Sequence, residues 1–230
     1  MSLGILGGMG PMATACFLEL LIDKTYAECD QDHLETIIYN CPQIPDRTNY
    51  ILGRSTDDPS YRMNKIARKL QDEGVDAIAI PCVTAGFFKE KIEEGIDIPI
   101  LYGVDYLASV LKEKGITAAG IMATDGTVKA GVIQKVLEEN GIKAVIPSEE
   151  DCALVMSLIY DDVKKGADPD VTKLEKVMAD LKAQGAQTSI LGCTELSVIR
   201  RNHTICGDYF DILEMLAEES LIACGKRIKK

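Results

Sequence analysis

Short apolar runs alternate with amphipathic segments along most of the chain. The apolar runs consist mainly of Val, Ile, Leu and Ala, without alternating polar positions. Such runs are typical of parallel strands that are covered by helices on both faces. We expect strands at 2–7, 36–40, 76–81, 98–102, 117–123, 142–146 and 187–192. We expect helices near 12–27, 56–73, 84–94, 103–114, 127–140, 149–165, 170–184 and 208–226.

The same pattern occurs twice. The stretches LGILGGMGPMAT (3–14) and AAGIMATDGTV (118–128) each carry an apolar strand into a turn that contains Gly and Thr. The pattern predicts an α/β fold with two similar lobes, each a mostly parallel sheet flanked by helices, and an active site in the cleft between them. We expect an N-terminal lobe over 1–98, a C-terminal lobe over 99–207 and a last helix, within 208–230, that packs back on the first lobe.

Two cysteines stand in matched settings at the ends of predicted strands. Cys82 follows DAIAIP and Cys193 follows QTSILG, and each comes just before a predicted helix start. Ligands of parallel sheets bind beyond the carboxyl ends of the strands. Because a helix N-terminus favours negative charge, we expect the thiol pKa to be lowered there, so that some thiolate forms. The simpler interpretation, that both are buried core cysteines, is the usual one for a single cysteine.

A matched pair of thiols in one cleft can invert a stereocentre. One thiolate removes a proton from one face of a carbon, and the other thiol returns a proton to the opposite face. The remaining six cysteines form no CxxC pair and no compact framework, so we expect neither a disulfide scaffold nor a cysteine zinc site.

Composition narrows the class of protein further. The chain has 230 residues, of which 47% are hydrophobic and 27% charged, with a formal net charge of -11. The negative charge argues against a nucleic-acid partner. No apolar run approaches the length of a membrane span, and the N-terminus lacks the basic region of a signal peptide, so we expect a cytoplasmic protein.

Several motifs together resemble the aspartate/glutamate racemases, and within them the aspartate racemase branch. They are GILGGMGPMAT (4–14), PDRT (45–48), PCVTAGF (81–87), MATDGT (122–127), IYDDVKKG (159–166) and ILGCTEL (190–196). The resemblance covers nearly the whole chain. It implies two α/β lobes, Cys82 and Cys193 as catalytic acid and base, no pyridoxal phosphate or metal, a small amino-acid substrate and a homodimer.

The chain departs from this family at two positions of the first cysteine motif. Val83 and Gly86 stand where the family usually has Asn and His. In the family that Asn helps to hold the polar α-groups of the substrate, and Val offers no side-chain hydrogen bond. The departures therefore concern the identity of the substrate rather than the two thiols.

Other candidate residues surround the two turns and the PDRT motif. Met9 and Gly10, with Thr14 early in the next helix, form either a backbone nest for a carboxylate or an ordinary tight turn. Arg47 is either a solvated arginine or a bidentate partner of a carboxylate, and the resemblance implies the second. The family also implies that Lys164, or its neighbour Lys165, reaches the distal carboxylate of the substrate.

Hydroxyl and carboxyl groups near the cysteines have two interpretations as well. Glu195 either favours the helix dipole or orients the surroundings of Cys193. The threonines either cap helices or bind the substrate. The threonines in question are Thr84, Thr124, Thr127 and Thr194.

Three functions therefore compete. The first is a cofactor-independent racemase of an acidic amino acid, aspartate before glutamate. The second is an isomerase or decarboxylase of another small carboxylate in the same superfamily. The third is a non-catalytic binding protein that kept the cleft. Solvent deuterium at the α-carbon separates them, because a racemase exchanges it and a binding protein does not.

Overall fold

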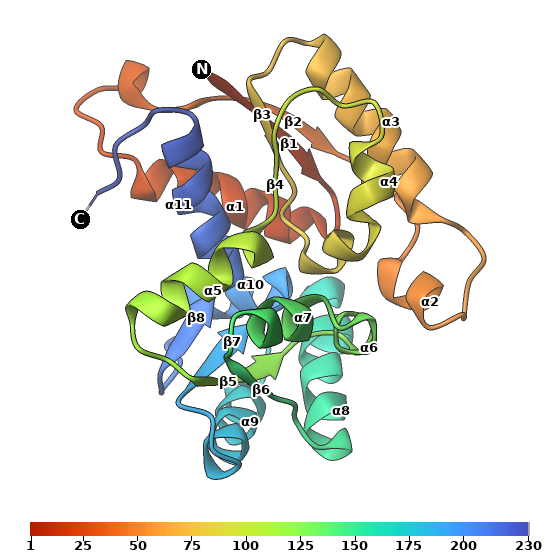
Figure 1. Cartoon of the computed structure of the whole chain (residues 1–230), viewed down its shortest axis with the longest axis vertical. Coiled ribbons are helices and arrows are strands. Elements are labelled where there is room, and N and C mark those ends of the chain that lie inside the picture. Colours follow the sequence, from red (N-terminus) through yellow and green to blue (C-terminus); the bar gives the residue numbers. More distant parts are fainter. Residues whose placement is uncertain (230) are drawn as a thin grey trace.

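Two parallel sheets with the same strand order form the two lobes. The computed structural model describes residues 1–229. The first sheet has the order β2-β1-β3-β4 and the second the order β6-β5-β7-β8, and every pair within them is parallel. The strands are β1 Ser2–Gly7, β2 Glu35–Asn40, β3 Ala77–Ala79, β4 Ile100–Leu101, β5 Ala118–Met122, β6 Lys143–Val145, β7 Thr188–Leu191 and β8 Tyr209–Asp211. The predicted fold class, two parallel α/β lobes, is confirmed (Figure 1).

Helices cover both faces of each sheet. In the first half of the chain they are α1 Pro11–Lys24, η1 Asp30–Asp32, α2 Arg47–Ile51, α3 Pro59–Asp72, η2 Val83–Phe88, α4 Lys89–Glu93 and α5 Gly103–Glu113. In the second half they are α6 Asp125–Ala130, α7 Val132–Glu139, α8 Glu149–Ser157, η3 Leu158–Asp162, η4 Val163–Lys165, α9 Val171–Ala183, α10 Thr194–Asn202 and α11 Ile212–Ala223. Here η2 and η4 are 3-10 helices and η3 is a π-helix.

Alternate side chains of each central strand enter different apolar cores. In β1, Leu3 and Ile5 pack with α1 and α11, whereas Leu6 faces the core on the other side of the sheet. The latter core continues into the second lobe through Ile121 and Ile190, so the lobes share one apolar interior. A third core lies under α8, α9 and α10. This shared packing fixes the carboxyl ends of the two sheets relative to each other.

The sheets extend beyond the expected lobe boundaries. The strand β4 lies after residue 98 but belongs to the first sheet, and β8 belongs to the second sheet although we expected a helix from residue 208. The helix prediction is wrong there because Asp211 caps α11: its carboxylate accepts hydrogen bonds from the backbone N–H groups of Leu213 and Glu214. The apolar residues just before this cap pair with β7. α11 itself packs on α1 of the first lobe.

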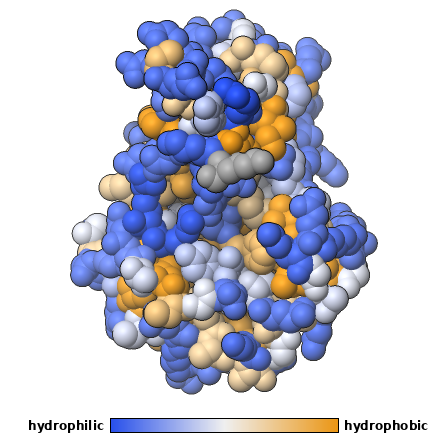
Figure 2. Space-filling model, turned by 90° about the vertical axis from the view of Figure 1, so that its left-hand side faces the viewer, coloured by the Kyte–Doolittle hydropathy of each residue, from blue (hydrophilic) through white to orange (hydrophobic). Residues whose placement is uncertain are grey.

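The exterior is mostly polar on the face that Figure 2 shows, with hydrophobic residues in separate patches. Among residues 1–229, no helix combines the length and the hydrophobicity that a membrane crossing requires.

Candidate active site

Equivalent strands of the two lobes position the two cysteines. Cys82 follows β3 and Cys193 follows β7, which hold the same place in the two strand orders. Each cysteine is the N-cap residue of the next helix, η2 or α10, in an extended backbone conformation. In both sheets this strand lies beside the first strand of its lobe, so the strand order reverses at the cysteine, where ligands of parallel sheets bind.

Both thiols line one small cavity between the lobes. Its volume is about 20 Å³, which is room for one or two water molecules. The first lobe contributes Met9, Asp46, Arg47, Thr48, Cys82, Val83 and Thr84, and the second contributes Thr124, Tyr160, Lys164, Cys193, Thr194 and Glu195. Ten of the thirteen predicted site residues thus surround a single cavity.

Polar contacts between the lobes close this cavity. The Tyr160 hydroxyl lies 3.1 Å from Asp46 Oδ2 and donates to that carboxylate. The hydroxyls of Thr48 and Thr124 are 3.1 Å apart. A cavity of this size holds no molecule larger than water, and we therefore call this arrangement of the lobes closed.

A buried guanidinium lies beside Cys82. The Nη1 atom of Arg47 donates to the backbone oxygens of Pro45 at 3.0 Å and Ile44 at 3.4 Å, and Nη2 donates to that of Met9 at 3.4 Å. Its buried Nε–H has no partner among the described residues. Burial lowers the pKa of Arg47, but negative charge on Cys82 and Asp46 outweighs burial and raises it. Arg47 therefore presents a fixed positive charge with donors to spare.

A buried carboxylate lies beside Cys193. The thiol donates to Glu195 Oε2 at 2.9 Å, and both side chains are buried. Burial, then the charge and hydrogen bond of Glu195, raise the pKa of Cys193 well above its ordinary value. Our expectation that the helix N-terminus lowers this pKa is therefore wrong in the closed form, because desolvation and a like charge outweigh the helix dipole. Cys193 is held as the neutral thiol.

A tyrosine and a lysine on one helical face complete the second lobe's side of the cavity. Lys164 Nζ lies 4.1 Å from the ring centroid of Tyr160 and 3.9 Å from Asp46 Oδ2. Burial lowers the pKa of Lys164, but the nearby Glu195 and other anionic groups outweigh it and raise the pKa, so the ammonium stays charged. Tyr160 lies in the π-helix η3, a distortion that is common at functional sites. The neighbouring Lys165 is exposed and pairs with Asp161 instead.

Three predicted residues do not line the cavity. Thr14 accepts a hydrogen bond from the Gly8 backbone N–H at 2.8 Å and donates to the Gly10 oxygen at 3.1 Å, so its hydroxyl is used within the turn. Thr127 is fully buried behind Thr84, with the two hydroxyls 2.8 Å apart. Gly10 lies beside the cavity, because a Cβ at this position would lie 3.3 Å from Glu195 Oε1.

The sequence prediction missed Asp46, Thr48 and Tyr160. All three lie in motifs that carried the resemblance: the first two flank Arg47 in PDRT, and Tyr160 precedes Lys164 by four residues, one helical turn. The spacing of Tyr160 and Lys164 was therefore a usable signal. The contacts of Asp46 and Thr48 were not foreseeable, because their partners come from the other lobe.

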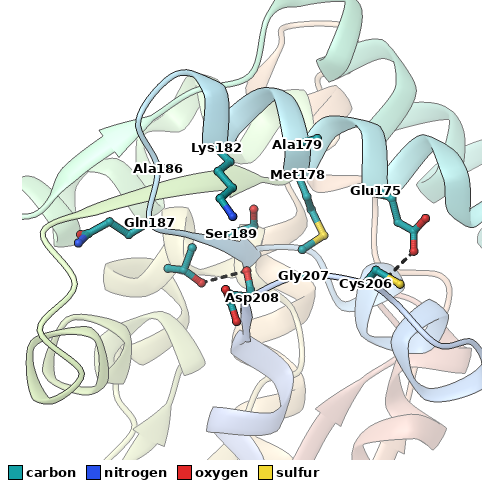
Figure 3. A pocket seen from close by; sticks show the side chains of 11 residues that line it. Glu175, Met178, Ala179, Lys182, Ala186, Gln187, Ser189, Cys206, Gly207 and Asp208 are labelled. Carbon is teal, nitrogen blue, oxygen red and sulfur yellow. Dashed lines mark hydrogen bonds between the residues drawn. The ribbon is translucent and has the colours of Figure 1, made fainter.

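A larger cavity on the second lobe has no connection with the predicted residues. It measures about 320 Å³ and lies between α9 and the amino end of β7. Its wall includes Glu175, which accepts a hydrogen bond from the Cys206 backbone N–H, and Lys182 (Figure 3). It lies at the opposite end of β7 from Cys193.

Throughout the described chain, no cluster of three or more His, Cys, Asp and Glu side chains is arranged to hold a metal ion.

Known proteins resemble the chain along most of its length. The family model for Asp/Glu/hydantoin racemase matches residues 6–208. The broad specificity amino-acid racemase RacX of Bacillus subtilis is 30% identical over 203 residues, which are 86% of each chain. The aspartate racemase of Picrophilus torridus has a similar structure, with a TM-score of 0.86 and 32% identity, covering 100% of this chain and 97% of that one. The glutamate racemase of Aquifex pyrophilus is 28% identical over 136 residues, 57% of this chain and 51% of that protein.

Proposed function

The chain belongs to the Asp/Glu/hydantoin racemase family and is an isomerase, and we propose that it racemises an acidic amino acid, with aspartate as the preferred substrate and glutamate as the next. The observation that carries the proposal is that Cys82 and Cys193, one from each lobe, line the same closed cavity. The reaction requires an acid and a base on opposite faces of the α-carbon, and two thiols of matched origin supply both without a cofactor.

The two thiols have different neighbours. Cys82 lies beside the Arg47 guanidinium. Cys193 is kept protonated by burial and by Glu195. In one direction we assign Cys82 as the base that takes the α-proton, while the Cys193 thiol gives its proton to the opposite face. In the other direction the two roles exchange, so the product of one turnover leaves the enzyme ready for the reverse reaction.

Two cations support an acidic substrate. Arg47 retains an unpaired Nε–H and one free Nη2 hydrogen, which suit a carboxylate, and Lys164 places a second positive charge on the same cavity. An acidic amino acid carries two carboxylates, and each can be matched by one of these cations. We assign both residues to substrate binding.

A broader amino-acid specificity is the second candidate. Val83 lines the cavity where the resembling family usually has Asn, so one hydrogen bond to the α-groups of the substrate is missing. The relative from Bacillus subtilis is itself named as a racemase of broad specificity. Weaker recognition of the α-groups would allow other side chains to be accepted.

A panel of L- and D-amino acids in D2O, without added cofactor, tests the proposal. We expect α-deuterium and loss of optical activity with aspartate first and glutamate second. Exchange with many neutral amino acids at similar rates would favour broad specificity. No exchange with any amino acid would overturn the proposal and leave another carboxylate reaction or a binding role.

A further inference from the structure

A second groove lies between the lobes, at the other end of η2 from Cys82. It measures about 770 Å³, within the range of sites for small molecules. Its first wall is the end of η2 and the helix α4, and its second is the turn between α6 and α7 with the helix α7. Figure 1 shows α4 in the upper lobe and α7 in the lower one, so a molecule in this groove would touch both lobes.

A buried phenol without a partner belongs to the wall of the groove. Tyr102, at the start of α5, is 2% exposed, and its hydroxyl makes no hydrogen bond to any described residue. Buried hydroxyls are nearly always hydrogen-bonded, so such an exception calls for an explanation. Burial, then the nearby carboxylates of Glu93 and Asp105, raise the pKa of Tyr102, so the phenol stays neutral and can both donate and accept.

The unpaired charge in the interior of the groove is negative. Lys89 pairs with Asp105 at 2.7 Å, and Lys91 pairs with Asp58 at 2.8 Å. The Glu93 carboxylate has no hydrogen-bond or ion-pair partner within residues 1–229, and it is partly buried. The other unpaired charges of the groove are exposed at its rim: Glu90, Lys135 and Glu139.

Aromatic and aliphatic side chains form the rest of the lining. Phe87 and Phe88 meet edge to face with ring centroids 5.0 Å apart, and half of the Phe87 side chain is exposed. Val132 and Val136 of α7 face them from the second lobe. A ring or a short aliphatic chain can pack here, and the Glu93 carboxylate in the same lining can pair with an ammonium group.

We propose that this groove binds a small organic cation, a primary amine with an aromatic or apolar body, through Glu93 and the Phe87–Phe88 pair. The bound molecule bridges the lobes and touches the same 3-10 helix that begins at Cys82. It therefore stabilises one arrangement of the lobes. The binding part of the proposal does not depend on the proposed racemase activity.

Phenethylamine is the probe, and 3-phenylpropionate, of similar size but opposite charge, is the matched control. Binding is measured by calorimetry and by thermal unfolding of the full chain without substrate. We expect phenethylamine to raise the Tm by roughly 5–10 °C at about 100 times its Kd. The phenylpropionate should leave the Tm unchanged, because its carboxylate meets Glu93.

Two neighbouring variants locate the site. Glu93→Gln should weaken phenethylamine binding by roughly 10-fold or more, since a charge-assisted hydrogen bond is lost. Glu94→Gln, an exposed neighbour outside the groove, should bind like the wild type. Equal binding of both probes, no binding of phenethylamine, unchanged binding by Glu93→Gln, or displacement of phenethylamine by aspartate would each overturn the proposal. An inactive enzyme that still binds phenethylamine through Glu93 would overturn only the proposed function.

Discussion

Replacing Arg47 by Lys should separate dicarboxylates from monocarboxylates. A guanidinium has five N–H groups, of which Arg47 uses three for backbone oxygens, at 3.0, 3.4 and 3.4 Å. Two N–H groups remain for a carboxylate. Lys keeps the charge but loses the planar pair of donors, so at least one charge-assisted hydrogen bond to the ligand is lost. Such a bond contributes about 1.5–3 kcal/mol, which corresponds to roughly a 10- to 150-fold loss of affinity.

The assay compares competitive inhibitors of equal chain length. The Ki of succinate should rise by roughly 10- to 150-fold in Arg47→Lys, whereas that of butyrate should change by less than about 3-fold. Arg54→Lys, at an exposed position of the same region, serves as the control. Circular dichroism and the Tm show whether the loop around Arg47 keeps its fold in the variant. This control is needed because Arg47 also donates a hydrogen bond to the Pro45 backbone oxygen at 3.0 Å. Equal changes in both Ki values would refute the assignment of Arg47 to carboxylate binding.

Three further predictions concern ionisable side chains, two beside the cavity and one in the core of the first lobe. Glu195→Gln removes the like charge beside Cys193, so the pKa of that thiol should fall and the alkaline limb of the pH–rate profile should move to lower pH. Lys164→Ala should lower kcat/KM for aspartate by roughly 10-fold or more, while Lys165→Ala, which changes an exposed lysine, should leave it near the wild-type value. Burial, then a nearby carboxylate, raise the pKa of Cys16 to about 11. The neutral thiol therefore stabilises the fold fully below its ordinary pKa of 9.0, and this contribution is lost as the pH rises toward 11. In urea unfolding, Cys16→Ala should show about 2–3 kcal/mol less loss of stability over this alkaline range.

The sequence was sufficient for the fold class, and most of the residues that it predicted for the site line one cavity. Continuous apolar runs located β1 to β7, and the repeated strand-end setting singled out Cys82 and Cys193. β8 was missed because it has only three residues and leads directly into a long apolar helix. Its last residue, Asp211, is also the N-cap of that helix. The long helix expected at 149–165 is instead three consecutive segments, α8, η3 and η4, and periodicity does not distinguish the π and 3-10 turns from α-helix.

Contacts between the lobes could not be predicted. Asp46 meets Tyr160 from the opposite lobe across 114 residues of sequence, and no local pattern encodes that pairing. The environment of Cys193 was misjudged for a related reason. A helix N-terminus is visible in the sequence, whereas full burial and the rotamer that brings Glu195 to 2.9 Å are properties of the folded site.

Two thiols are proposed to act on opposite faces of one α-carbon, and α-deuterium exchange by the two serine variants tests this mechanism. Cys82→Ser and Cys193→Ser are each incubated with L- and D-aspartate in D2O, and deuterium and configuration are followed by NMR and chiral chromatography. We expect both variants to lose racemisation in both directions. Each should still exchange the α-proton of one enantiomer, and the two variants should prefer opposite enantiomers. Racemisation near the wild-type rate by either variant would refute the two-thiol mechanism and make that cysteine a packing residue.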